Sequence, residues 1–208
     1  GSLTSNEKIV NLSMPNLRKL GEGSLEALPK LESVFVPNLE EIGGWCFQYV
    51  EKLKGFDAPK LRELPKNNLD DCTNLQTLNL PNLTKIGSYC LGSCRRLDVV
   101  DLPMLESVGT AVLENSHAKV VNLPRLKIAG QRFLHSTYGI KELNLPSLEK
   151  LGSNSMRIMN DLERIWDKEG DFVETGSQNP TENASSGISE NKTATLTILH
   201  LGDVFLDS

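Results

Sequence analysis

The sequence predicts a repeat solenoid of the α/β or mainly β class, with about nine coils of 22 residues stacked along one parallel sheet. Two observations predict it. Prolines recur with spacings of 22, 22, 22, 22, 21 and 22 residues, and the same frame of apolar residues and glycines returns around each one. A unit of this length cannot bury its apolar face alone, so we expect the copies to stack. The prolines are Pro15, Pro37, Pro59, Pro81, Pro103, Pro124 and Pro146.

Each coil is predicted to begin with a short strand that ends at the proline. Apolar residues stand six, three and one positions before it, as Leu75, Leu78 and Leu80 stand before Pro81. The last two alternate with polar residues, which is the period of a strand with one buried face. Proline stops such a strand because it has no N–H to donate and its φ is fixed. We expect these strands to pair in parallel.

The second half of each coil carries further inward positions. Leucine follows the proline by two residues, an aliphatic residue by five, and glycine by six in six of the seven coils, with Pro65 as the exception. We expect the glycine at a corner, where the backbone turns sharply or takes a positive φ. A large apolar residue ten positions after the proline, such as Phe47 or Leu91, lies in a segment long enough for one helical turn. The predicted coil therefore runs strand, extended segment, helical turn.

The frame continues beyond the last proline with altered spacing. Leu162, Ile165 and Asp167 take the strand positions of an eighth coil, and residues 196–202 fit a ninth. The two strand ends lie 34 residues apart instead of 22, so 12 residues are inserted within a polar stretch at about 168–192. We expect a mobile surface loop there. Residues 1–208 are predicted to form a single solenoid domain, part of a longer array because neither end shows a polar capping coil.

Composition and motifs exclude several function classes. The net charge of −5 argues against a nucleic-acid surface, which needs a clustered basic face. No run of 18 apolar residues is present to insert into a membrane. The sequence holds no phosphate-binding glycine loop, HExxH or GxSxG motif, and its three histidines fall on different coils. We therefore expect no enzymatic activity, no cofactor and no metal.

The repeat is clearest from Leu80 to Pro103, which reads Leu-Pro-Asn-Leu-x-x-Ile-Gly-x-x-Cys-Leu-x-x-Cys-x-x-Leu-x-x-Val-x-Leu-Pro. This pattern resembles the BspA-like subclass of leucine-rich repeats, and seven coils over roughly residues 9–160 carry versions of it. It departs from the commoner leucine-rich repeat in placing Leu83 where a buried Asn is usual. The resemblance implies a right-handed leucine-rich-repeat solenoid from a secreted or cell-surface protein of a bacterium or parasite, which binds host proteins or other partners.

The four cysteines fall on two columns of the repeat. Cys46 and Cys90 come nine positions after a proline, and Cys72 and Cys94 come thirteen after one. The simplest interpretation is packing in the core, because free cysteine is among the most buried residue types. The alternative is a disulfide between Cys72 and Cys94, since equal positions of adjacent coils lie within reach of such a bond.

An outward column of polar residues runs between the last two apolar positions of each strand. Asn and Asp dominate it, which favours a ladder of side-chain hydrogen bonds from coil to coil. Calcium between Asp57 and Asp101 is a weaker interpretation, because two coils, roughly 10 Å, separate them. The column contains Ser13, Phe35, Asp57, Asn79, Asp101, Asn122, Asn144, Trp166 and His200.

The same column supplies the candidate partner-binding residues. Trp166 and His200 are predicted on adjacent strands, with Arg164 beside them and the polar insertion nearby, a composition typical of binding hot spots. Phe35, exposed on the sheet, is a second candidate. We thus expect a non-enzymatic module that presents a strand-lined surface to a host or surface protein, outside the cell or on its surface. The alternatives are glycan binding, with Trp166 or Phe35 as a stacking platform, and a structural spacer for another domain.

Overall fold

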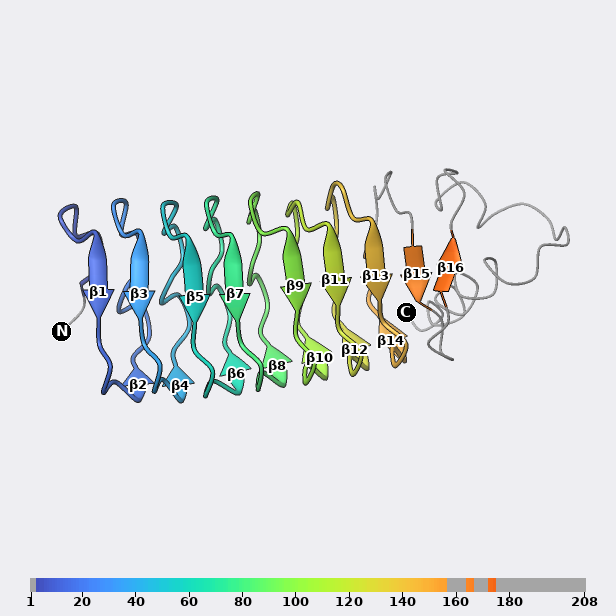
Figure 1. Cartoon of the computed structure of the whole chain (residues 1–208), viewed down its shortest axis with the longest axis horizontal. Helices are drawn as coiled ribbons and strands as arrows, with labels where there is room; N and C mark the ends of the chain where they lie inside the picture. Colours follow the sequence, from blue (N-terminus) through green and yellow to red (C-terminus); the bar gives the residue numbers. More distant parts are fainter. Residues whose placement is uncertain (1–2, 157–163, 167–171, 175–208) are drawn as a thin grey trace, which may run out of the picture.

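The computed structural model describes residues 3–156, 164–166 and 172–174. Within these ranges the chain forms 16 short strands and no helix. Figure 1 shows the coils side by side in a nearly straight row that starts at the N-terminus. The predicted mainly β solenoid with 22-residue coils is therefore confirmed over the seven proline-marked coils, and the predicted ninth coil lies outside the described residues.

The predicted strands before the prolines are present and form what we call the first sheet. Neighbouring strands pair in parallel, with equal repeat positions opposite each other, as Leu12 lies opposite Val34. The hydrogen-bonded ladder joins β1 to β3, β5 to β7, and β9 onward, and it is open between β3 and β5 and between β7 and β9. The strands are β1 (Asn11–Ser13), β3 (Ser33–Phe35), β5 (Gly55–Asp57), β7 (Thr77–Asn79), β9 (Val99–Asp101), β11 (Val120–Asn122), β13 (Glu142–Asn144) and β15 (Arg164–Trp166).

The extended segment after each proline forms a second sheet of two-residue strands. These strands also pair in parallel, in the order β2 to β4 and β6 through β8, β10 and β12 to β14. One residue of each strand faces the core and the other faces solvent, as Ile86 and Lys85 do in β8. The strands are β2 (Lys19–Leu20), β4 (Glu41–Ile42), β6 (Glu63–Leu64), β8 (Lys85–Ile86), β10 (Ser107–Val108), β12 (Ile128–Ala129) and β14 (Lys150–Leu151).

The predicted helical turn is wrong. In the segment eight to twelve residues after the proline, alternate residues take a positive φ, as Asn67 (58°), Leu69 (56°) and Asp71 (55°) do, although the middle residue of the first two coils, Leu25 or Phe47, does not. Their N–H groups bond to neighbouring coils: Asn67 donates to the Ser88 carbonyl at 3.0 Å and Asp71 to the Gly92 carbonyl at 3.0 Å. A helix is about 10–12 Å wide, roughly twice the spacing of paired strands, so a helix in every coil would spread this side and curve the row, whereas the coils stand in a nearly straight row (Figure 1).

The glycines six positions after the proline serve close packing between coils. The sequence suggests either a sharp turn or a positive φ as the reason for these glycines, and none of them has a positive φ. A Cβ on Gly109 would lie 2.6 Å from the Ser88 nitrogen, and one on Gly43 would lie 2.4 Å from the Glu22 nitrogen. The backbone of the preceding coil therefore occupies the space that any side chain would need.

One apolar core runs through the solenoid, and all four cysteines are buried in it as free thiols. The disulfide alternative is therefore wrong. Each thiol instead donates to a carbonyl of the preceding coil, as Cys72 does to Phe47 (3.1 Å) and Cys94 to Leu69 (3.2 Å). Burial raises the pKa of Cys72 and Cys94 well above the usual thiol range and that of Cys90 to about 12, so these thiols stay protonated at neutral pH.

The expected loop at 168–192 is wrong at its beginning. Residues 172–174 form strand β16 (Phe172–Glu174), which pairs antiparallel with β15 and places Phe172 opposite Trp166. Figure 1 shows β16 next to β15 at the far end of the row from the N-terminus. The insertion thus contributes a strand that reverses the chain direction at this end of the first sheet.

We predict that Gly109→Ala destabilises the protein by at least about 2 kcal/mol, because the new methyl group meets the backbone of the preceding coil. Urea unfolding followed by circular dichroism measures the change. Gly21→Ala is the matched control: it stands at the same repeat position in the first coil, where the nearest atom to a Cβ is Ser24 Oγ at 3.5 Å. Equal stability losses for the two variants would contradict the close-packing role.

Candidate functional site

The outward side chains of the first sheet form a surface with few charges. We define the first-sheet face as the first and third residues of β1, β3, β5, β7, β9, β11 and β13, whose middle residues point toward the core. Three of these 14 residues are charged, all three are acidic, and none is Lys or Arg. They are Asn11, Ser13, Ser33, Phe35, Gly55, Asp57, Thr77, Asn79, Val99, Asp101, Val120, Asn122, Glu142 and Asn144.

The outward side of the second sheet is different. We define the second-sheet face as the outward residue of each two-residue strand together with the residue before it. Eleven of these 14 residues are charged, and ion pairs such as Lys19 with Glu41 (2.7 Å) link neighbouring coils. This is the composition of a solvated surface, where such pairs contribute little. The residues are Arg18, Lys19, Glu40, Glu41, Arg62, Glu63, Thr84, Lys85, Glu106, Ser107, Lys127, Ile128, Glu149 and Lys150.

Side-chain hydrogen bonds fix the polar column of the first-sheet face, as predicted. Asn79 donates to Asp57 at 2.9 Å, Asn122 donates to Asp101 at 2.7 Å, and Asn144 donates to Asn122 at 2.6 Å. The ladder is confirmed in two runs, which are separated where β7 and β9 do not pair. These bonds hold the amide and carboxylate groups in set orientations before any partner arrives.

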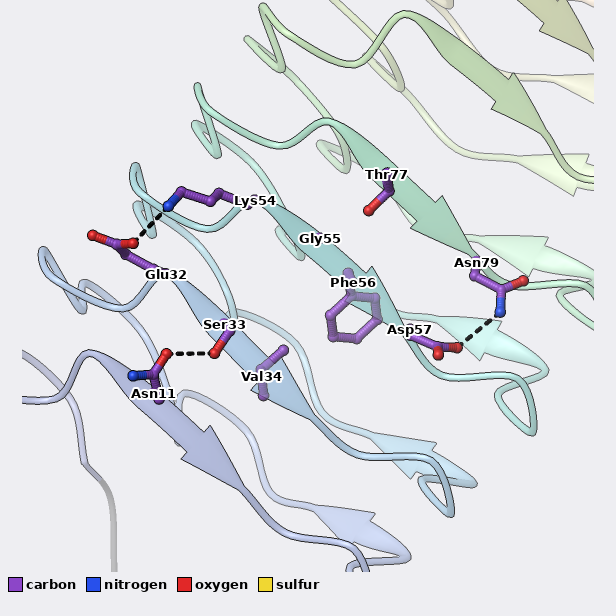
Figure 2. Close-up of a pocket in the computed structure, with 10 residues that line it drawn as sticks. All are labelled: Asn11, Glu32, Ser33, Val34, Lys54, Gly55, Phe56, Asp57, Thr77 and Asn79. Atoms are coloured by element: carbon purple, nitrogen blue, oxygen red, sulfur yellow. Dashed lines mark hydrogen bonds and ion pairs between the residues drawn. The ribbon is translucent and has the colours of Figure 1, made fainter.

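The first-sheet face is hollowed where its ladder is open between β3 and β5. A groove of about 510 Å³ lies there, and Figure 2 shows Gly55 amid its lining residues, with Phe56 on the side of β5 that faces β3 and Val34 on β3. Gly55 lacks the side chain that the same position carries in every other described coil. The lining residues are Asn11, Glu32, Ser33, Val34, Lys54, Gly55, Phe56, Asp57, Thr77 and Asn79.

The charges of this groove are unequal at its two ends. At one end Lys54 Nζ lies 2.6 Å from Glu32 Oε2, and this hydrogen bond lowers the pKa of Glu32. At the other end Asp57 accepts a hydrogen bond from the neutral amide of Asn79 (Figure 2), which orients the carboxylate but leaves its charge in place. The net charge of the groove is therefore negative and is concentrated at Asp57.

Comparison with known proteins identifies the repeat. The family described as "BspA type Leucine rich repeat region" matches residues 2–119 and 42–163, with six copies. The chain belongs to this leucine-rich-repeat family. Among solved structures, a leucine rich cell surface protein from Faecalibacterium prausnitzii A2-165 is similar at 14% identity and a TM-score of 0.47. The alignment covers 82% of this chain and 56% of that one, so the chain spans little more than half of that protein's length. No curated protein is significantly similar in sequence.

The BspA-type solenoid places the predicted site residues in two regions. Phe35 lies on the first-sheet face, next to the groove strand β5, and 52% of it is exposed. The backbones of Arg164 and Trp166 extend the first sheet, opposite Glu142 and Asn144. His200 lies outside the described residues, and β16 occupies the place next to β15 that the sequence assigned to the strand of His200.

Two kinds of site that the sequence argued against can be checked over the described ranges. There, no three His, Cys, Asp or Glu side chains gather closely enough to hold a metal ion, so Asp57 and Asp101 have no third ligand of this kind. The same ranges contain no helix with the length and hydropathy needed to cross a bilayer.

Sequence reasoning missed the aromatic residues on the side that replaces the predicted helical turn. Tyr49 and Tyr89 are about half exposed there, and Lys66 Nζ lies 4.0 Å from the centre of the Trp45 ring. All three rings stand eight or twelve positions after a proline, where φ is positive. The signal in the sequence is their recurrence at these two positions, which an assignment to a helical turn concealed.

We predict from the same side of the solenoid that Asp70→Asn stabilises the protein at neutral pH. Burial raises the pKa of Asp70, against the opposing effect of the Gln48 amide at 3.0 Å, so ionised Asp70 weakens the folded state. Because the pKa of Asp70 is higher in the folded state, this loss of folding stability is absent below about pH 4, the pKa in the unfolded state. It grows as the pH rises through the pKa in the folded state. The difference in melting temperature between variant and wild type should therefore grow from pH 4 to pH 7.

Differential scanning fluorimetry across this pH range measures the effect. Glu63→Gln, on the second-sheet face, is the control for the loss of one negative charge. A stabilisation by Asp70→Asn that is equally large at both ends of the pH range would contradict the burial argument.

Proposed function

We propose that this protein is a non-enzymatic module that binds a protein partner through its first-sheet face. The observation that carries the proposal is the contrast in charge between the outward strand residues of the two sheets: three of 14 are charged in the first sheet, against five of seven in the second. The centres of protein interfaces are depleted of charged side chains relative to the rest of the surface. Both sheets repeat with the same period, so the contrast does not follow from the fold.

Exposed apolar side chains support the same face. Phe35 and Val99 are 52% and 51% exposed on it, and the hydrogen-bonded column of Asn and Asp runs beside them. Such a surface combines apolar contact area with preoriented polar groups, as binding surfaces do. The expected location outside the cell or on its surface agrees with this role and stays a prediction from the family.

Surface substitutions on the two sheets test the proposal. We expect Phe35→Asn with Val99→Asn to abolish capture of the partner, because both exposed apolar side chains are lost. Asn is native to both positions in other coils, at Asn79 and Asn11, so folding should persist, and a melting curve checks this. The matched control is Ile128→Lys, which removes a 47% exposed side chain from the second-sheet face, where Lys is also native.

The measurement is quantitative mass spectrometry of proteins captured from extracellular extracts by the immobilised wild type and variants. The proposal predicts a protein that is enriched by the wild type and by the Ile128→Lys control and lost with the double variant. Equal loss with the control would contradict the assignment to the first sheet. A glycan array in parallel addresses the alternative: a glycan signal that depends on Phe35, without any captured protein, would replace the protein partner by a glycan.

A further inference from the structure

We propose that the groove at Gly55 is a pocket for an arginine side chain of the protein partner. The proposal rests on the proposed function and adds the chemistry of the residue recognised. Three features of the groove support it: its shape, its apolar floor and its unbalanced charge.

The shape depends on one missing side chain. Every other described coil has a side chain at this position of the first sheet, and Gly55 has none, just where the ladder between β3 and β5 is open. The resulting space of about 510 Å³ falls within the range of roughly 300–1,000 Å³ that is usual for ligand pockets. It therefore admits a long side chain from a partner lying across the sheet.

The floor is apolar although the rim is polar. Val34 and Phe56 belong to the inward column and line the groove from below, with 8% and 1% of their surface exposed. Arginine buries its methylene stem along apolar surface while its charged end reaches a polar group. The floor thus suits the stem of such a side chain.

The charge selects a cation. The Lys54 and Glu32 charges neutralise each other at 2.6 Å, whereas Asp57 is bound by a neutral amide, and none of the 14 outward strand residues of the first-sheet face is Lys or Arg. Phe35 holds the position equivalent to Asp57 on the neighbouring strand, so an aromatic ring lies one coil from the carboxylate, outside the residues that line the groove. A guanidinium group can pair with a carboxylate through two hydrogen bonds and stack on an aromatic ring, which lysine does less well.

The test uses the blocked tripeptide acetyl-Gly-Arg-Gly-amide, titrated into the ¹⁵N-labelled protein and followed by amide chemical shifts. We expect saturable shifts at Ser33, Gly55 and Asp57. The citrulline analogue, which keeps the shape and loses the charge, should bind at least about tenfold more weakly. Equal binding of the two peptides, or shifts spread over the second-sheet face, would overturn the proposal.

Two variants probe the two causes separately. Gly55→Val adds a side chain native to this position at Val99, whose Cβ displaces the Thr77 hydroxyl from its place 2.5 Å away, and Asp57→Asn removes the charge with a residue native to its column at Asn79. Each should weaken the arginine peptide by at least about tenfold. Asp101→Asn, in the same column away from the groove, is the matched control and should leave the affinity unchanged. Unchanged affinity in Asp57→Asn overturns the proposal even if Gly55→Val fails to fold.

The same variants separate this proposal from the proposed function. If partner capture requires Phe35 and Val99 but not Gly55 or Asp57, the first-sheet face binds the partner and the arginine pocket is wrong. If the arginine peptide binds in the groove while no captured protein depends on Phe35 or Val99, the pocket is supported as a site for arginine side chains, and the first-sheet function is wrong.

Discussion

The spacing between neighbouring coils is the constraint on which the rest of the structure depends. Two hydrogen-bonded strands lie about 4.8 Å apart, and the first and second sheets both stack coils in parallel register. In a nearly straight row the third side keeps the same spacing, which a helix of about 10–12 Å width would widen (Figure 1). Its backbone alternates into positive φ at residues as bulky as Leu91 and Leu113, at a cost of about 1–2 kcal/mol each. Hydrogen bonds to the coils on both sides offset that cost. Leu91 donates to Asn68 of the preceding coil, and Tyr89 donates to Thr110 of the following one.

The same spacing explains why small polar residues are buried in an apolar core. The turn side leaves carbonyl groups facing inward, and inward side chains of the next coil donate to them: Cys46 to Gly21, Asn68 to Gly43 and Thr137 to Leu113. A buried carbonyl without a donor costs free energy, so Cys, Asn, Ser and Thr at these columns stabilise the stack. Among the described residues, Ser116 Oγ is the buried side-chain atom without a hydrogen-bond partner. Thr137, at the same repeat position in the next coil, does donate to a carbonyl, that of Leu113.

The period of the sequence was enough to predict the strands, their parallel pairing, the inward columns and the ladder from Asn79 to Asp57. Each of these follows from residue type at a fixed repeat position. The alternating φ values could not be predicted from the sequence. Leucine rarely adopts a positive φ, so the local preference of Leu69 and Leu91 favours a negative one, and only contacts between coils stabilise the observed backbone. Strand β16 was missed for a related reason. It forms by pairing with the edge strand β15, and the polar composition of its own stretch, taken without that partner, predicts a loop.

The groove was missed because it arises where two strands, β3 and β5, do not pair. Gly55 is a single glycine in a column otherwise made of Ser, Thr, Asn, Val and Glu. Nothing in the sequence of its own coil shows that β5 does not pair with β3. In a solenoid each coil contacts only its neighbours, so an unpaired junction costs stability locally and leaves the rest of the stack intact. A glycine in a strand also weakens that strand. The array therefore tolerates open junctions between β3 and β5 and between β7 and β9. The first of them, with an apolar floor and an unneutralised Asp57, has features that distinguish its coils from the others for a binding partner.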